Sequence, residues 1–298
     1  MKTRYFVSFN EGKKSYRRVR RLLETIGCSD GLPDDENDIL AGFFAKTLDS
    51  TDPKLAALRS LLKRKGIKWS EREEHVYGDD ELRSFPLLEL SIDRKPLNVG
   101  GADYGTTYDL SNACPRCGSG AVQTSPLLLP LSGYPKKGDL CATVFHEILV
   151  SVKLAQALRE DKVTGLELRQ IRFYRNNEPL PWWQMISTFE MPKMSKETRG
   201  ITWHDGQQGD CTVCGRDGYS HSLDEPWQIA YSKAQVDPAV LPDAVRTWEV
   251  FGNAEINYEE PRRSRFGEQR ILVKPKVFDV FRRLTVRHAR FVPVRIVN

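Results

Sequence analysis

Residues 114–118 read Cys-Pro-Arg-Cys-Gly and residues 211–215 read Cys-Thr-Val-Cys-Gly, so the pattern CxxCG occurs twice; we call these segments hook 1 and hook 2. A CxxC spacing lets one tight turn deliver two thiolates, and a structural zinc site takes four tetrahedral ligands. The glycine after the second cysteine permits a positive φ, so the backbone can fold under its own sulfur ligands. These patterns predict one structural zinc ion per chain, bound by four cysteines. They are Cys114, Cys117, Cys211 and Cys214.

Two other interpretations of the cysteines are weaker. Four buried cysteines spaced this way by chance would not be expected to repeat the full CxxCG pattern. A redox CxxC normally occurs once, at a helix N-terminus after a strand, whereas each hook continues into glycine and polar turn residues. His204 and His221 flank hook 2 and could replace a cysteine, although four thiolates already complete the site. The long separation of the hooks is permissible because the cost of loop closure grows only logarithmically with length.

Four thiolates around Zn²⁺ leave a net charge of −2, which nearby cations would offset. Arg116 lies inside hook 1 and Arg216 directly follows hook 2. We expect these two arginines to supply that positive charge.

Length and composition describe an ordinary globular protein. The chain has 298 residues, enough for about two domains, with 40% hydrophobic and 29% charged residues. No apolar run approaches the ~20 residues that a membrane span needs, and the N-terminal apolar stretch Tyr5–Phe9 is too short for a signal peptide. We therefore expect a cytoplasmic protein with no membrane partner. Its cysteines, including the isolated Cys28 and Cys141, should then be thiols.

The net charge of +5 is unevenly distributed. Residues 1–30 carry +5 and residues 259–298 carry +7, so the middle of the chain carries −7. An acidic middle favours a basic protein partner, whereas basic ends favour phosphate, so charge alone does not choose between them.

The predicted fold is α+β in two parts, with a glycine-rich boundary near residues 95–96. Residues 1–95 read as an N-terminal α+β unit of β-α-α-β-β order, whose last strand contains Pro86 and is therefore expected at a sheet edge. The expected strands and helices share alternating or helical apolar spacing. They are a strand at 5–9, a helix at 16–26, a helix beginning at Asp52-Pro53, and strands at 67–76 and 82–92.

Residues 96–298 are expected to form a larger α+β domain organised around the zinc site. Asp139 should cap a long helix with Cys141, Phe145, Ile148 and Leu158 on one face. A strand over 166–174 changes the phase of its alternation near residue 170, which indicates a β-bulge. The chain should close with a strand at 271–274, a short helix opened by a proline at 275, and a strand at 286–294.

The chain resembles the double-CxxCG motif proteins over residues 96–298. The resemblance lies in the two hooks, the segment Tyr104–Asp109, the segment Thr164–Leu168 and the closing strand-helix-strand Ile271–Val294. That paralogous family is abundant in myxobacteria, and some members are immunity proteins against toxins delivered between related cells. The resemblance implies a zinc-stabilised protein that binds a cognate toxin stoichiometrically.

No residue pattern supports catalysis. His146-Glu147 begins like the HExxH zincin helix, but position 150 is valine, so the second histidine ligand is missing. Neither a glycine-rich phosphate loop nor a nucleophile elbow occurs. We expect a non-enzymatic binding protein.

The alternative function is a zinc-ribbon nucleic-acid-binding protein. Its evidence is the basic run Lys13–Arg21, with a similar cluster at Arg262, Arg263 and Arg265. The run also fits the solvated face of an amphipathic helix, which we favour. Three tryptophans between the hooks, Trp182, Trp183 and Trp203, are either core residues or anchors for a protein partner. The partner's identity and the oligomeric state stay open.

Overall fold

The structure is a computed structural model, and it divides the chain into two compact units. It describes residues 2–38, 40–92, 97–115, 118–132, 138–203, 211, 213–216, 218–221, 227–251 and 268–298. The first unit comprises residues 1–81 with 221–227, and the second comprises 82–220 with 228–298. Both units combine helices with strands, so the predicted α+β class is confirmed.

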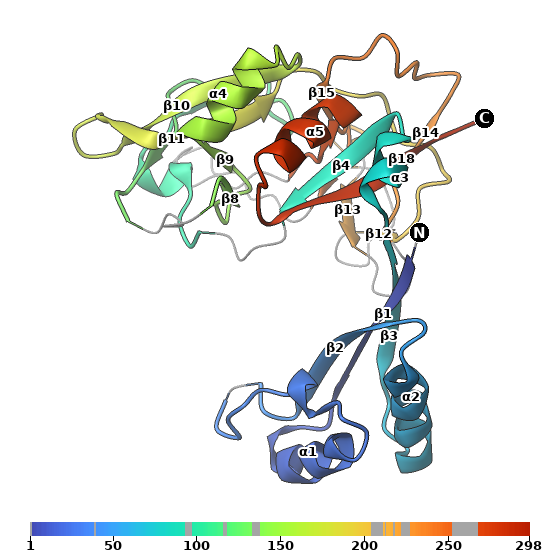
Figure 1. Ribbon diagram of the computed structural model, residues 1–298. Coiled ribbons are helices and arrows are strands. Elements are labelled where there is room, and N and C mark those ends of the chain that lie inside the picture. The colour runs from blue at the N-terminus through green and yellow to red at the C-terminus, as the bar shows by residue number, and fades with distance from the viewer. Residues whose placement is uncertain are drawn as a thin grey trace. The chain divides into compact units, whose positions relative to one another are not determined.

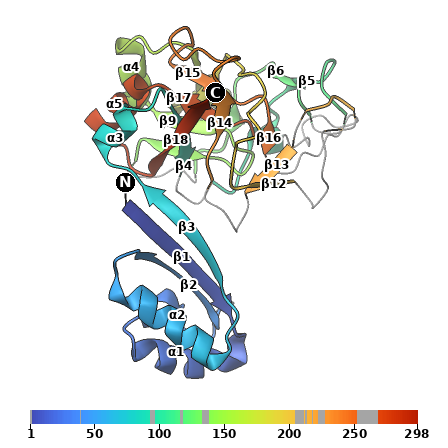
Figure 2. The same ribbon diagram turned by 90° about the vertical axis from the view of Figure 1, so that its right-hand side faces the viewer.

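The first unit is a three-stranded antiparallel sheet, in the order β2-β1-β3, that packs against two helices. Its strands are β1 (Lys2–Asn10), β2 (Phe43–Asp49) and β3 (Ser70–Val76). Its helices are α1 (Tyr16–Glu24) and α2 (Pro53–Lys65), with the short 3₁₀ turns η1 (Lys13–Ser15) and η2 (Ser29–Gly31). Figures 1 and 2 show both helices beside this sheet.

One face of the sheet and one face of each helix form the core of the first unit. Val7 and Phe9 alternate inward from β1, which confirms the strand predicted at 5–9. Val19 of α1 and Leu58 of α2 are buried in the same hydrophobic cluster. The strand β2 was not predicted, although its Phe44 stacks on Phe9 with ring centroids 4.9 Å apart.

The limits of α2 follow from its sequence. Asp52 accepts a hydrogen bond from the Lys54 backbone N–H at 2.9 Å, and Pro53 occupies the first helical position. Gly66 ends the helix in the left-handed conformation with φ of 65°. The start of the helix is the one predicted.

The second unit contains two five-stranded sheets. The first sheet has the order β7-β10-β11-β9-β8 and the second has the order β14-β18-β4-β17-β15. The strands of the first sheet are β7 (Leu128–Leu129), β8 (Leu140–Ala142), β9 (Ile148–Ser151), β10 (Leu166–Phe173) and β11 (Pro179–Ser187). Those of the second are β4 (Leu87–Ile92), β14 (Ala230–Ser232), β15 (Ala244–Arg246), β17 (Ile271–Val273) and β18 (Ala289–Val297).

Smaller elements complete the second unit. The pair β5-β6 and the sheet β12-β13-β16 hold the two hooks, and helices α4 and α5 lie side by side in Figure 1. These remaining strands are β5 (Tyr108–Asp109), β6 (Val122–Gln123), β12 (Ile201–Trp203), β13 (Gly218–His221) and β16 (Val250–Phe251). The helices are η3 (Gly101–Tyr104), α4 (Val152–Glu160) and α5 (Pro275–Arg283), while the short helix α3 (Asp79–Arg83) contains the boundary between the two units. None of the described helices is long and apolar enough to cross a membrane.

The division of the structure differs from the boundary predicted near residue 95, because β4 belongs to the second unit. This strand is antiparallel to β17 on one side and to β18 on the other, so it is the central strand of its sheet rather than an edge. Pro86 precedes the strand and removes no ladder hydrogen bond from it. The units divide between Glu81 and Leu82.

The long helix predicted from Asp139 is also wrong. Its sequence forms β8, a turn, β9 and then α4, which begins at Val152 after the N-cap Ser151. His146 has a φ of 65° in the turn, and Asp139 accepts a hydrogen bond from the Ser151 hydroxyl at 2.7 Å. The β-branched residues of the segment favour a strand, and pairing with β11 determined the outcome.

The end of the chain and the bulge are confirmed. The register of β10 against β11 shifts between Gln170 and Arg172. The closing segment forms β17, α5 and β18, in which the ring of Phe291 makes T-shaped contacts with those of Phe278 and Phe281. Because β17 and β18 flank β4 and run parallel to each other, α5 makes a crossover connection above β4.

Candidate metal centre

Hook 1 is the loop between the paired strands β5 and β6. Tyr108 lies opposite Gln123 in this short antiparallel pair. The Cys114 N–H donates to the Ser119 carbonyl at 2.8 Å, and the Gly118 N–H donates back to the Cys114 carbonyl at 2.9 Å. Gly118 has a φ of 71°. The first cysteine of the hook is thus held in a closed turn.

Hook 2, in the loop between the neighbouring strands β12 and β13, makes the same pair of backbone hydrogen bonds. The Cys211 N–H donates to the Arg216 carbonyl at 2.8 Å, and the Gly215 N–H donates to the Cys211 carbonyl at 2.7 Å. Gly215 also has a φ of 71°, and a Cβ added there would meet no atom within 4 Å. Glycine is therefore favoured there by its positive φ and not by crowding.

The two hooks bring three sulfur atoms together. The Sγ atoms of Cys114, Cys211 and Cys214 all lie within 4.8 Å of one another, and those of Cys114 and Cys211 are 3.5 Å apart. Thiolates bound tetrahedrally at ~2.3 Å from one zinc ion lie about 3.8 Å from each other. Cys114 is buried and Cys214 is exposed. This cluster could bind one metal ion; the predicted fourth ligand, Cys117, lies outside the described residues.

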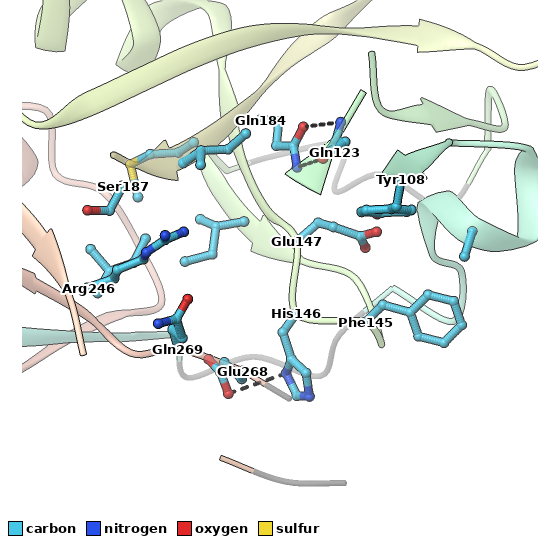
Figure 3. Close-up of a pocket in the computed structure, with 15 residues that line it drawn as sticks. Tyr108, Gln123, Phe145, His146, Glu147, Gln184, Ser187, Arg246, Glu268 and Gln269 are labelled. Carbon is cyan, nitrogen blue, oxygen red and sulfur yellow. Dashed lines mark hydrogen bonds and ion pairs between the residues drawn. The ribbon is translucent and has the colours of Figure 1, made fainter. Parts of the chain in front are cut away.

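Both strands of the β5-β6 pair are fastened to the neighbouring sheet by polar side chains. The carboxamides of Gln123 in β6 and Gln184 in β11 donate to each other, at 3.1 and 2.8 Å. On β5, the Tyr108 phenol is hydrogen-bonded to the Glu147 carboxyl. Figure 3 shows Tyr108 and the glutamine pair around Glu147. Hook 1 is therefore positioned by β6 and β5 together.

Glu147 connects three segments at once. Besides Tyr108, its carboxyl contacts the Thr143 hydroxyl and accepts the Gly101 N–H at 3.0 Å. Burial raises the pKa of Glu147 above its ordinary value, while the hydrogen bonds from Thr143 and Gly101 act against that rise. Burial, and then the neighbouring Glu147 carboxyl, raises the pKa of Tyr108.

Hook 2 is fastened by Arg216. Its two Nη atoms each donate to one Glu190 carboxylate oxygen at 3.1 Å, and its guanidinium lies 5.0 Å from the centroid of the Trp248 ring. Arg216 also donates to the Trp248 carbonyl. Glu190 thus pairs with Arg216, and the expectation that this arginine also offsets the thiolate charge stays a prediction. Arg116 lies outside the described residues.

Of the histidines named from the sequence, His146 is described, and it does not join the cluster. His146 lies in a turn rather than on a helix, and its Nδ1 is 3.4 Å from a carboxylate oxygen of Glu268. Figure 3 shows this contact. His204 and the side chain of His221 lie outside what is described. Cys28 and Cys141 are buried in separate hydrophobic cores.

The tryptophans have different environments. Trp182 is 6% exposed and belongs to a hydrophobic core, which removes it as an anchor for a partner. Trp183, on the opposite face of β11, is partly buried beneath Arg159, whose guanidinium lies 3.9 Å from the ring centroid. Trp203 lies in β12, but its side chain is outside the described part, as is the cluster Arg262–Arg265.

A groove next to the hooks was not predicted. A cavity of about 650 Å³ is lined by Gly118–Gln123, Gln184, Arg216 and Arg246, among others. A second cavity of about 230 Å³ shares Tyr108, Gln123, Gln184, Arg246 and Gln269 with it and continues to Glu147 (Figure 3). These residues come from separate elements and follow no spacing that a sequence pattern could reveal.

Comparison with known proteins does not assign a family. No protein-family model matches the chain, and no curated protein matches it.

Proposed function

We propose that this chain is a zinc-stabilised protein-binding module that acts as an immunity protein, neutralising a cognate toxin by stoichiometric binding. The observation that carries the proposal is the meeting of Cys114 with Cys211 and Cys214 across 97 residues of chain. Four thiolates would leave no open coordination position for a substrate, which favours a structural metal. Cysteine thiolates in tetrahedral geometry favour zinc among the common metal ions.

A structural metal in this position would serve binding rather than turnover. A stoichiometric inhibitor needs a surface whose shape is fixed before the partner arrives, because disorder in the free protein costs affinity. One ion joining two hairpins would fix both at once. The toxin as partner rests on the resemblance to double-CxxCG immunity proteins over residues 96–298.

The test is co-expression with a toxin encoded beside this gene. We expect the host to survive and the two chains to co-purify in a fixed ratio, and we expect Cys211→Ser to lose both effects. Val213→Ser is the matched control, because Val213 is an exposed residue of the same hook that offers no metal ligand. Host death despite folded, zinc-loaded protein, with every toxin encoded nearby, would end the immunity hypothesis.

The nucleic-acid alternative receives mixed support from the basic helices. The run Lys13–Arg21, in η1 and α1, is partly neutralised, since Arg17 pairs with Glu36 and Arg18 with Glu11 at distances up to 2.9 Å. At the end of α2, in contrast, residues 63–65 and Lys68 are exposed and have no acidic partner among the described residues. That cluster keeps the alternative worth testing.

If these cations contact nucleic acid, affinity should fall steeply with salt, because binding releases counterions from phosphates. Binding of duplex DNA and of RNA should be measured by fluorescence anisotropy at low and near-physiological salt. Arg64→Gln with Lys65→Gln should lower the logarithmic salt slope by roughly 2, about 1 per removed contact. No measurable affinity at low salt would dispose of the nucleic-acid function.

A further inference from the structure

The groove next to the metal centre has walls from both hooks. Hook 1 and the residues after it, Gly118–Gln123, form one wall, and Arg216, which follows hook 2, forms part of another. Strands β10 and β11 contribute Arg169 and Gln184, and β15 contributes Arg246. A volume of about 650 Å³ lies within the range of ligand-binding clefts. Anything that fixes the hooks therefore also shapes this groove.

Three guanidinium groups line the groove, and two of them are each paired with a carboxylate. Arg169 is held by Glu167 through two hydrogen bonds of 2.6 and 2.8 Å. Arg216 is held by Glu190 through two of 3.1 Å. Each pair has the fork geometry that makes arginine–carboxylate pairs strong. These two arginines and two glutamates cancel in charge.

The third guanidinium, that of Arg246, has no comparable acceptor among the described residues. Its nearest carboxylate oxygen is Oε2 of Glu190, at 3.8 Å, and its Nε has no hydrogen-bond partner. The same oxygen already accepts from Arg216 and, at 2.7 Å, from Gln269. Burial acts to raise the pKa of Glu190, but hydrogen bonds from Arg216 and Gln269 hold that pKa below its ordinary value. Glu190 is therefore ionised, and its single negative charge is shared between Arg216 and Arg246. The groove has one positive charge in excess at Arg246.

That excess identifies the kind of ligand. The Arg246 side chain is 38% exposed although its Nε is buried, so a planar group with two oxygens would be received by the two Nη atoms. One spare positive charge matches a carboxylate better than a phosphate dianion. Both carboxamide donors of Gln269 are used, on Glu190 and on the Thr247 carbonyl, which leaves its Oε1 to accept an N–H. A ligand that offers a carboxylate next to amide N–H groups is an acidic residue within a peptide.

We propose that this groove binds a glutamate or aspartate side chain of the partner protein, with Arg246 as the group that receives the carboxylate. The inference rests on the proposed function for the identity of the partner. The groove itself is testable without any toxin.

The test uses zinc-loaded protein and three probes, the blocked peptides Ac-Gly-Glu-Gly-NH₂ and Ac-Gly-Gln-Gly-NH₂ and free acetate, each titrated by NMR. The glutamate peptide should bind with a dissociation constant on the order of 1 mM, and the glutamine peptide at least ~10-fold more weakly. Arg246→Gln should abolish the difference, Arg246→Lys should keep part of it, and Arg175→Gln, outside the groove, should keep all of it. Retained folding of each variant is checked in the same spectra.

Several results would overturn the proposal. Equal affinity for the two peptides, or unchanged binding of the glutamate peptide by Arg246→Gln, would contradict it. So would the absence of binding at a glutamate-peptide concentration of ~10 mM, which is 10-fold the expected dissociation constant. A fourth contradicting result is that acetate binds as tightly as the peptide. The last result would assign the groove to a free carboxylate instead. Where a toxin complex is available, Arg246→Gln should weaken it at least ~10-fold while Arg175→Gln does not. If no toxin binds, the proposed immunity function is contradicted, but the peptide titrations still test whether the groove binds an acidic side chain.

Discussion

Replacing Cys211 by serine is expected to lower bound zinc from one ion per chain towards none and to destabilise the second unit severely. The reason is geometric: Cys211 lies 3.5 Å from Cys114 in sulfur–sulfur distance, and it is the first ligand that hook 2 offers. Structural zinc contributes about 10–16 kcal/mol of apparent binding free energy in small zinc-finger peptides. Losing such a site should cost more than the ~4 kcal/mol that marks an exceptional single substitution.

Elemental analysis of protein purified without chelators measures the zinc, and thermal unfolding measures the cost. At about 2–4 °C per kcal/mol for a domain of this size, the midpoint should fall by roughly 10 °C or more. Val213→Ser, in the same hook, should leave both quantities near those of the parent protein. If Cys211→Ser retains one zinc ion per chain, Cys211 is not a ligand.

Local sequence signals predicted elements well where they agreed with the tertiary structure. The ends of α2 are determined by Asp52, Pro53 and Gly66, all within the helix's own sequence, so no distant contact was needed to find them. The hooks are similar, because a CxxCG turn closes through its own backbone N–H groups. The CxxCG pattern does not predict how two hooks so far apart in the chain come together in the fold.

Elements determined by distant pairing were missed. Cys141, Phe145 and Ile148 have helical spacing, yet the segment is extended because β9 pairs with β11. β4 joins a sheet whose other strands lie more than a hundred residues later, and its Glu89 is 2% exposed at the centre of that sheet, so the strand lacks the alternation of a half-buried edge. Arg246 of β15 and Glu190 meet for the same reason, because an isolated parallel β-bridge joins these two residues although they lie far apart in the sequence.

The second large effect is expected at Glu147, where alanine should destabilise the protein by roughly 2–4 kcal/mol. The substitution leaves the Gly101 N–H without its acceptor at 3.0 Å and removes the carboxyl that holds Thr143 and Tyr108. An unsatisfied buried donor costs ~1–3 kcal/mol, and more than one donor is affected. Because Tyr108 lies in β5, the strand leading into hook 1, Glu147→Ala should also weaken zinc binding.

Glu147→Gln separates the carboxyl's hydrogen bonds from its charge. Glutamine keeps an acceptor for Gly101 and can donate to the Thr143 hydroxyl, so the variant should fold and bind zinc. Burial raises the folded-state pKa of Glu147 above the unfolded value of about 4.3. Between those two values the folded protein binds more protons than the unfolded chain, so this group's contribution to stability falls as pH rises through that window. Glutamine does not titrate and should escape that loss.

Urea unfolding of both proteins at about pH 4, 6 and 8, with saturating zinc, measures the difference. Zinc binding depends on pH through the thiolates, but that dependence is common to both proteins and cancels in the comparison. The stability of Glu147→Gln relative to the parent should rise as pH rises from about 4.3 towards the folded-state pKa and then stay constant. A relative stability that is flat across the range, or that falls with pH, would mean that Glu147 is not held with a raised pKa. The anchoring of β5 would then rest on an ionised carboxylate that donors fully stabilise.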